Sequence, residues 1–180
     1  DEMEHMIDEY LAFARGEAGE ATQTIRIGDL LEAAGEDARR VGAEVEVAAP
    51  GDLTASLRPL AFKRALTNLA GNAASHGDKT RLSARALPSG GLEVIVEDDG
   101  PGIPEDMYEE AFRPFSRLDA SRNQNSKGVG LGLAIARDVV RGHGGDIALD
   151  RSDLGGLKAI IRLPEQGRSH FEAGTGEAAP

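Results

Sequence analysis

Cysteine is absent from this chain of 180 residues, which excludes disulfide bonds and thiolate metal sites and leaves the redox compartment open. Long apolar runs are also missing: no stretch approaches the roughly 20 residues of a membrane-spanning helix, and the polar, acidic start does not resemble a signal peptide. Cations are scarce, since 20 Lys and Arg oppose 31 Asp and Glu for a formal net charge of -11. Because broad phosphate contact needs Lys and Arg concentrated on one face, this balance argues against nucleic acid as a partner.

Hydrophobic residues make up 40% of the chain, which is enough for a single packed core with short appendages. Apolar periodicity predicts alternating strands and helices, and therefore an α/β fold in two layers. The expected strands cover residues 22–27, 44–48, 53–57, 81–87, 92–96, 146–149 and 157–163, and the expected helices cover residues 30–41, 60–75, 104–112 and 129–141. Asp29 is placed to cap the first of these helices.

Residues 1–15 have a helical pattern of their own, with Met3, Ile7, Tyr10 and Ala14 on one apolar face. Such a seam suits a coiled-coil or bundle partner, and the alternative is a terminal helix packed on its own domain. A short glycine-containing linker follows. At the other end of the chain, the polar tail has too little apolar surface to order itself.

Two asparagines four residues apart, Asn68 and Asn72, project from one face of the helix expected over residues 60–75. Asparagine is a poor residue for a helix interior, so a pair at this spacing suggests a polar role. Its side-chain oxygen is a neutral, hard ligand that suits Mg²⁺ already carrying phosphate charges. The alternative is a pair of solvent-facing side chains.

A carboxylate and two glycines follow the strand expected over residues 92–96, namely Asp98, Gly100 and Gly102. The glycines allow the chain to turn and another group to approach its backbone. A carboxylate at this point can accept a hydrogen bond from an exocyclic amine and so select adenine. A plain turn is the alternative, since Asp-Gly and Gly-Pro pairs are common in turns.

A second glycine segment, with Gly128, Gly130 and Gly132, leads into the last expected helix. The N–H groups and positive dipole end of a helix attract an anion such as phosphate. Nearby cations supply the positive charge that the whole chain lacks: Lys127, Arg113, Arg117 and Arg122. Repeated glycine also permits tight packing without a ligand. Residues 116–127 are polar and aperiodic, which is typical of a mobile lid.

Four segments in this order resemble the sequence boxes of the ATP-binding catalytic domain of bacterial sensor histidine kinases, within the GHKL superfamily. The segments are residues 68–73 (NLAGNA, the asparagine box), 98–104 (DDGPGIP, the first glycine box), 112–117 (FRPFSR, the phenylalanine box) and 128–133 (GVGLGL, the second glycine box). The resemblance implies a Bergerat fold, in which a mixed sheet is layered against helices and ATP lies between the asparagine helix and the lid.

The same resemblance assigns roles by position. Asn72 would hold Mg²⁺, Asn68 would support the metal and phosphate geometry, and Asp98 would accept from the adenine amine directly or through water. The other expected nucleotide-binding residues are Gly100, Gly102, Ile103, His76, Arg117, Lys127, Gly128, Val129, Gly130, Leu131 and Gly132. For His76, stacking on the base and a solvent-facing position are both open. Phe112 and Phe115 are expected to anchor the lid in the core.

Asn68 also separates branches of the superfamily. Type II topoisomerases, mismatch-repair ATPases and chaperone ATPases carry Glu at this position as a base for water, whereas Asn cannot take a proton. The resemblance therefore implies a pocket that holds Mg·ATP for a histidine on a separate helical hairpin, in two-component signal transduction. An ATP-gated binding module without transfer activity and a water-directed ATPase are the alternatives.

No histidine of this chain has the acceptor context of the family, which is His followed by an acidic residue, Leu-Arg and a proline. We therefore expect a piece of a longer protein, with residues 1–16 ending a dimerisation hairpin, residues 17–164 forming the catalytic domain and residues 165–180 forming a disordered tail. The expected partners are ATP, the histidine-acceptor domain and a response regulator. The expected parent is a homodimer anchored in the inner membrane, with this domain in the cytoplasm.

Overall fold

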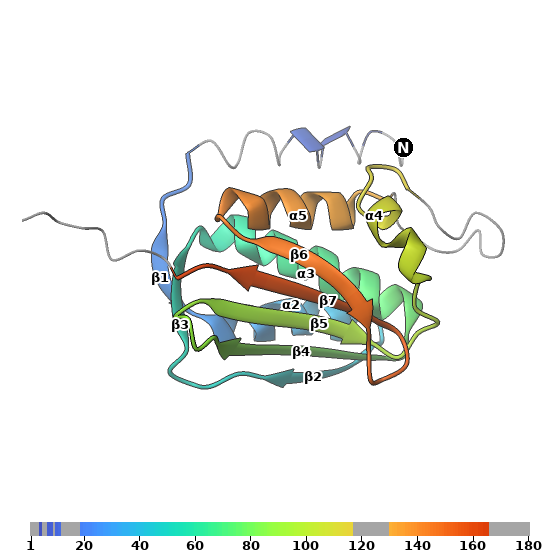
Figure 1. Cartoon of the computed structure of the whole chain (residues 1–180), viewed down its shortest axis with the longest axis horizontal. Helices are drawn as coiled ribbons and strands as arrows, with labels where there is room; N and C mark the ends of the chain where they lie inside the picture. The colour runs from blue at the N-terminus through green and yellow to red at the C-terminus, as the bar shows by residue number, and fades with distance from the viewer. Residues whose placement is uncertain (1–3, 5–6, 9, 12–18, 117–129, 166–180) are drawn as a thin grey trace, which may run out of the picture.

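A computed structural model describes residues 4, 7–8, 10–11, 19–116 and 130–165 of the chain. Within these residues, a five-stranded mixed sheet is covered on one face by three long helices, and a two-stranded sheet closes one end (Figure 1). The predicted two-layer α/β architecture is confirmed.

The elements follow the order β1 (Gln23–Arg26), α2 (Ile27–Arg40), β2 (Glu44–Ala48), β3 (Thr54–Leu57), α3 (Pro59–His76), β4 (Lys79–Ala86), β5 (Leu92–Asp98), η1 (Glu105–Met107), α4 (Tyr108–Ala111), α5 (Gly132–Gly142), β6 (Asp146–Arg151) and β7 (Leu157–Leu163). The large sheet has the strand order β2-β4-β5-β7-β6. Strands β2 and β4 are parallel, and the other neighbouring pairs are antiparallel. Strands β1 and β3 form the small antiparallel sheet.

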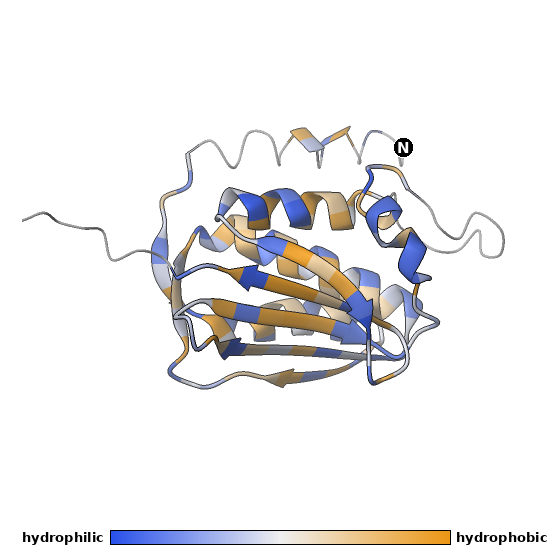
Figure 2. Ribbon diagram, in the orientation of Figure 1, coloured by the Kyte–Doolittle hydropathy of each residue, from blue (hydrophilic) through white to orange (hydrophobic). Residues whose placement is uncertain are grey.

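Alternation along the strands decides which side of the sheet is buried against the helices. On β4 and β5, Leu82 and Val96 are register partners on the helix-facing side, and both are buried. Helix α3 packs against these two strands, and its Phe62 and Leu66 are fully buried. Figure 2 shows the hydrophobic residues concentrated on the central strands and along the helices. The core therefore lies between α3 and the centre of the sheet.

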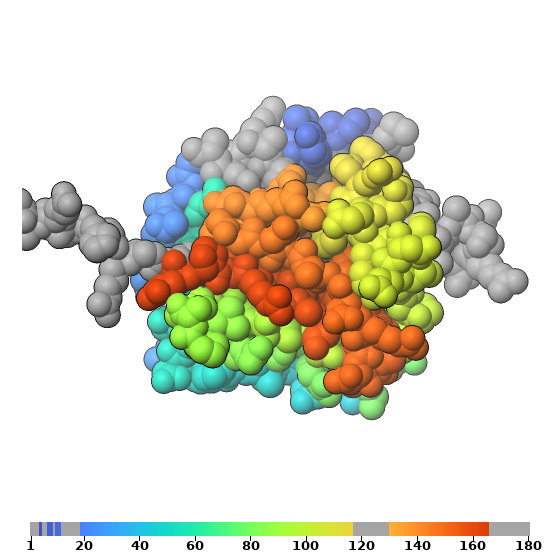
Figure 3. All heavy atoms as spheres, viewed as in Figure 1, coloured from blue at the N-terminus to red at the C-terminus, as the bar shows by residue number. Residues whose placement is uncertain are grey.

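None of the described helices covers the opposite face of the sheet, so side chains of β5 and β7 lie on the surface in Figure 3. Glu93 on β5 is nevertheless buried, because Arg85 and Arg162 from the neighbouring strands close over it. The Nε atoms of these arginines donate to its two oxygens at 2.8 and 3.0 Å. The hydrogen bond from Arg85 is the main cause that lowers the pKa of Glu93 below its ordinary value.

The N-terminal end of α3 is held by two distant parts of the chain. The Glu20 carboxylate accepts from the N–H groups of Leu60 and Ala61 at 2.9 and 3.0 Å, which satisfies donors that a helix start leaves unpaired. His143, after α5, accepts from the Arg58 N–H through Nε2 at 3.0 Å. The second ring nitrogen of His143 lies 2.7 Å from the Val139 carbonyl oxygen, which fixes the ring.

The boundaries differ from the predicted ones in one instructive place. Helix α2 begins at Ile27, so Asp29 lies in its first turn and the prediction that Asp29 caps the helix is wrong. The Ile27 N–H donates to the Leu53 carbonyl at 3.0 Å, so the helix follows β1 without an intervening loop. Tertiary contact, which the local pattern does not contain, thus sets this boundary.

The described residues before residue 12 are helical, as predicted, and Ile7 and Tyr10 are 53% and 55% exposed. The role of residues 1–16 as the end of a dimerisation hairpin stays a prediction, as do the domain limits at residues 17 and 164. The predicted tail lies almost wholly outside the described residues. No helix in the described ranges has the length and apolar character needed to cross a membrane.

Candidate functional site

One face of α3 carries a polar stripe, formed by Asn68, Asn72 and His76 at successive intervals of four residues. At 1.5 Å per residue the stripe runs about 12 Å along the helix. The two asparagines are half-buried and their amide groups have no hydrogen-bond partner among the described residues. His76 is exposed, and its Nδ1 lies 2.7 Å from the Asn72 carbonyl oxygen. The predicted pair of Asn side chains thus keeps its full hydrogen-bonding capacity.

Asp98 lies beyond the last turn of this helix, at the end of the helix-facing row of β5, and is only 3% exposed. Its Oδ1 accepts from the backbone N–H groups of Gly100 and Leu157 at 2.8 and 3.3 Å. Within the described part of the chain, no donor is in hydrogen-bonding distance of its Oδ2. Burial raises the pKa of the Asp98 carboxyl, and the two N–H donors offset part of the rise. Oδ1 of this buried carboxylate thus has its donors within the protein, and Oδ2 can accept a hydrogen bond from a ligand.

Backbone from three segments surrounds Asp98, and side chains would not fit there. A Cβ on Gly156 would overlap the Asp98 carboxylate, and one on Gly100 would lie 2.5 Å from the His76 carbonyl oxygen. At the end of α3, a Cβ on Gly77 would come within 2.5 Å of the Asp99 carboxylate. We call Gly77, Gly100 and Gly156 the glycine cradle.

Two members of the cradle, Gly77 and Gly156, are not among the predicted site residues. The Gly156 N–H donates to the Asp98 carbonyl oxygen at 3.0 Å, so the β6–β7 turn is fastened to the end of β5. The only local signal is the Gly155-Gly156 pair, and it does not indicate which carboxylate the turn will meet.

The rest of the first glycine segment lines the same region. Gly102 has a φ of 70°, a conformation that favours glycine, and a Cβ added to it would lie 3.5 Å from the Gly156 carbonyl. Ile103 is half-buried and packs against the core. Of the predicted residues of this segment, Gly100 thus contacts the Asp98 carboxylate directly, and Gly102 lies next to Gly156.

The start of α5 faces the other end of the polar stripe. A Cβ on Gly132 would touch Asn68, 3.7 Å from its Cβ, and Leu131 before it is buried. Gly130 has a φ of 76°, and its carbonyl oxygen accepts from the Phe115 N–H at 3.0 Å. The two glycine segments therefore meet opposite ends of one α3 face. Four predicted site residues lie outside the described ranges: Arg117, Lys127, Gly128 and Val129.

Phe112 and Phe115, the two phenylalanines expected to anchor the lid in the core, differ in burial. Phe112 is buried under the Arg137 guanidinium, whose central carbon lies 4.2 Å from the ring centroid, so its predicted position in the core is confirmed. Phe115 is 63% exposed, and the prediction that it anchors in the core is wrong. Its φ of 63° and its hydrogen bond to Gly130 hold the backbone in a turn that leaves the ring outside.

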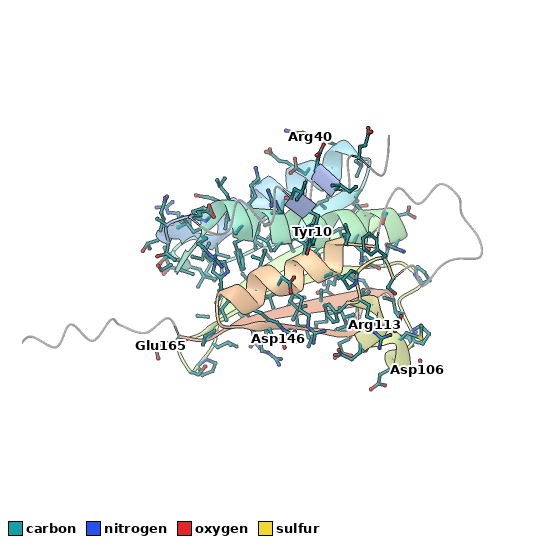
Figure 4. All side chains as sticks on the ribbon, turned by 90° about the horizontal axis from the view of Figure 1, so that it is seen from above. Tyr10, Arg40, Asp106, Arg113, Asp146 and Glu165 are labelled. Carbon is teal, nitrogen blue, oxygen red and sulfur yellow. The ribbon has the colours of Figure 1, made fainter. Side chains whose placement is uncertain are left out.

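A surface hollow of about 650 Å³ lies beside Phe115. It is lined by Asp106, Met107, Glu109, Glu110, Arg113, Phe115 and Ser116. Asp106 and Arg113 lie at the same end of the molecule, opposite Glu165 (Figure 4). Three carboxylates in its wall make the hollow unsuitable for an anionic ligand.

Residues 58–167 match the family model described as "Histidine kinase-, DNA gyrase B-, and HSP90-like ATPase". The sensor histidine kinase GtrS of Pseudomonas aeruginosa is 42% identical over 110 residues, which cover 61% of this chain and 22% of that protein. The sensor histidine kinase CpxA of Escherichia coli is 33% identical over 174 residues, which cover 93% of this chain and 38% of that protein. The chain thus spans well under half the length of these relatives.

Solved structures agree with these sequence relatives. The ATP-binding domain of PrrB from Mycobacterium tuberculosis has 29% identity and a TM-score of 0.66, over 81% of this chain and 98% of that one. Full-length ShkA in complex with AMPPNP has 27% identity and a TM-score of 0.73, over 89% of this chain and 35% of that one. The residues matched by the family model, 58–167, include the polar stripe, Asp98 and the start of α5. The chain therefore belongs to the family of histidine kinase-, DNA gyrase B- and HSP90-like ATPases.

Proposed function

We propose that this chain binds Mg·ATP and transfers the γ-phosphoryl group to a histidine on a domain outside it. The observation that carries the proposal is Asp98, a buried carboxylate with Oδ1 held by two backbone donors and Oδ2 without a partner among the described residues. An exocyclic amine such as that of adenine is the complementary donor. The neighbour bound to AMPPNP supports a nucleotide as the ligand.

The polar stripe on α3 gives the nucleotide its direction. With the base at Asp98, the phosphates would extend along Asn72 and Asn68 toward the start of α5, about 12 Å away. The N–H groups at that helix start would face the terminal phosphates. Arg117 and Lys127, which lie outside the described residues, would supply the cationic partners in this proposal.

The donor set fits Mg²⁺ only together with phosphate. The described residues contain no cluster of three or more His, Cys, Asp or Glu that could hold a metal alone. A half-buried amide such as that of Asn72 adds one neutral oxygen, which suits an ion already bound by phosphate oxygens. Mg²⁺ would neutralise phosphate charge during transfer, and Asn72 would orient it, supported by Asn68.

Asn68 favours transfer over hydrolysis, because an amide cannot act as the general base for water. In the proposed step an imidazole nitrogen forms a bond to the γ-phosphorus while the bond to the β–γ bridging oxygen breaks. ADP leaves with that electron pair. The acceptor domain and the membrane anchor would belong to a longer protein that forms a homodimer and has a response regulator as its partner, in line with relatives that are sensor histidine kinases.

Calorimetry with Mg·ATP tests the binding half of the proposal. We expect Asp98→Asn to weaken ATP binding by roughly ten- to hundredfold, the range for a lost hydrogen bond to a charged group. Asp78→Asn is the matched control, because it makes the same charge change on an exposed side chain near the end of α3. Equal ATP affinity in Asp98→Asn and the wild type would refute the assignment.

Radiolabelled ATP tests the transfer half. The chain is mixed with the histidine-containing hairpin of a sensor kinase relative, and label is followed on the hairpin. Label on the histidine supports the kinase. Tight ATP binding without label would favour an ATP-gated binding module, and rapid phosphate release without a hairpin would favour a hydrolase.

A further inference from the structure

Thr80 presents an unexplained polar group inside the fold. The residue is only 1% exposed, yet its Oγ1 has no hydrogen-bond partner in the part of the chain that the structure describes. Most buried hydroxyl groups have a partner, so each exception calls for a reason. The helix-facing row of β4 carries apolar Leu82 and Ala84 after Thr80, and the hydroxyl stands at the end of this row.

The strand register sets Thr80 directly beside Asp98. The flanking pair carries the backbone hydrogen bond, from the Asp99 N–H to the Lys79 carbonyl at 3.3 Å. Thr80 and Asp98 therefore form a pair without backbone hydrogen bonds of its own, the class in which side chains approach most closely, with Cβ atoms roughly 4.5–5.5 Å apart. A hydroxyl and a carboxylate thus lie side by side on the face that α3 covers.

We propose that Thr80 is a specificity-determining residue for adenine: its hydroxyl donates, directly or through one ordered water, to the ring nitrogen beside the exocyclic amine that Asp98 accepts. This inference rests on the proposed binding of ATP. Adenine presents a donor and an acceptor next to each other on this edge, and Asp98 and Thr80 supply the matching acceptor and donor. Guanine presents the reverse order, so its oxygen would face the Asp98 carboxylate.

The alternative is that the Thr80 hydroxyl is simply buried without a hydrogen bond and has no role in nucleotide binding. The two accounts agree on ligand-free stability, because Thr80→Val removes an unpaired polar group and keeps the shape. Valine also suits a strand, so the variant should fold. They differ only in nucleotide binding.

The experiment is calorimetry with Mg·ADP and Mg·GDP on the wild type, Thr80→Val and Thr80→Ser. We expect Thr80→Val to weaken ADP binding about three- to tenfold, to reduce the preference for ADP over GDP, and to unfold at or above the wild-type temperature. Thr80→Ser keeps the hydroxyl and should bind ADP within about twofold of the wild type. Thr54→Val, on the exposed side of β3, is the control and should change neither quantity.

Two results would overturn the inference in distinguishable ways. If the wild type binds ADP and Thr80→Val binds it equally well with the same preference over GDP, Thr80 has no role in recognition while the proposed function stands. If the wild type itself binds neither nucleotide, the proposed function fails and the inference falls with it.

Discussion

The two ends of helix α3 differ in whether their buried polar groups have hydrogen-bond partners. At the N-terminal end, which we call the capped end, Glu20 and His143 accept from backbone N–H groups of Arg58, Leu60 and Ala61. At the C-terminal end, the glycine cradle brings backbone against Asp98 and Asp99. The hydroxyl of Thr80, the register partner of Asp98, has no hydrogen-bond partner among the described residues. Satisfied groups stabilise a fold, whereas unsatisfied ones mark positions where function outweighs stability.

Strand β5 shows the same contrast within one element. Both of its ends carry a buried carboxylate, Glu93 and Asp98. Arginine partners lower the pKa of Glu93, and burial raises the pKa of Asp98. The first carboxylate therefore favours folding when ionised, and the second is tolerated in its ionised form despite burial.

The largest expected effect is at the cradle. Gly156→Ala places a methyl group where the Asp98 carboxylate lies, so the β6–β7 turn and the carboxylate must move apart. We expect about 1–3 kcal/mol of lost stability from overpacking. The loss of ATP affinity should be at least as large as the roughly ten- to hundredfold loss expected for Asp98→Asn, because the carboxylate itself is displaced. Gly51→Ala, in a turn with open space, is the calorimetric control. If Gly156→Ala bound ATP with wild-type affinity, the contrast between the glycine cradle and the capped end of α3 would not hold.

The pH dependence of unfolding separates the two β5 carboxylates. Glu93→Gln should lower the free energy of unfolding at pH 7 by about 1.5–3 kcal/mol, the range for hydrogen bonds to charged groups. Because the pKa of Glu93 is lowered in the fold, this stabilisation is present above the unfolded pKa of about 4.3 and is lost as the pH falls through the folded value. Urea unfolding at several pH values measures how the gap to the wild type closes in acid.

Asp98→Asn should show the opposite trend in the same urea series. Because the pKa of Asp98 is raised in the fold, its contribution to stability is present below the unfolded pKa of about 3.9 and is lost as the pH rises through the folded value. The variant should therefore gain stability relative to the wild type between acid and neutral pH. Parallel trends for the two variants would show that the ends of β5 do not differ.

Cap removal tests the other end of α3. Glu20→Ala should lower the free energy of unfolding by about 1 kcal/mol, the usual effect of losing a helix cap, and leave ATP affinity within about twofold, since the site lies at the far end of α3. Glu20→Gln keeps one acceptor oxygen and should fall between the wild type and Glu20→Ala in thermal unfolding. A large loss of ATP affinity in Glu20→Ala would mean that the capped end also serves the site.

Local pattern was sufficient for the parts of the site that a single segment contains. The i, i+4 spacing of Asn68 and Asn72 placed them on one helix face, and Asp98 closes its strand as expected. Local pattern could not predict the parts of the site where distant segments meet. The Leu157 N–H reaches Asp98 across 59 residues, and the isolation of the Thr80 hydroxyl follows from strand register. The prediction that Phe115 anchors in the core was wrong because its backbone has a positive φ, which turns the ring outward and which composition does not reveal.

The smallest expected effect comes from a glycine that, unlike those of the cradle, has room for a side chain and is not expected to be needed for ATP binding. Gly71 lies in α3 between the two asparagines, and a Cβ there would meet nothing within 4 Å. Gly71→Ala should raise the free energy of unfolding by about 0.5–1 kcal/mol, because alanine favours a helix interior over glycine. ATP affinity should stay within about twofold of the wild type. Thermal unfolding and calorimetry on one preparation measure both, and weaker binding would show that backbone approach at the stripe matters as it does in the cradle.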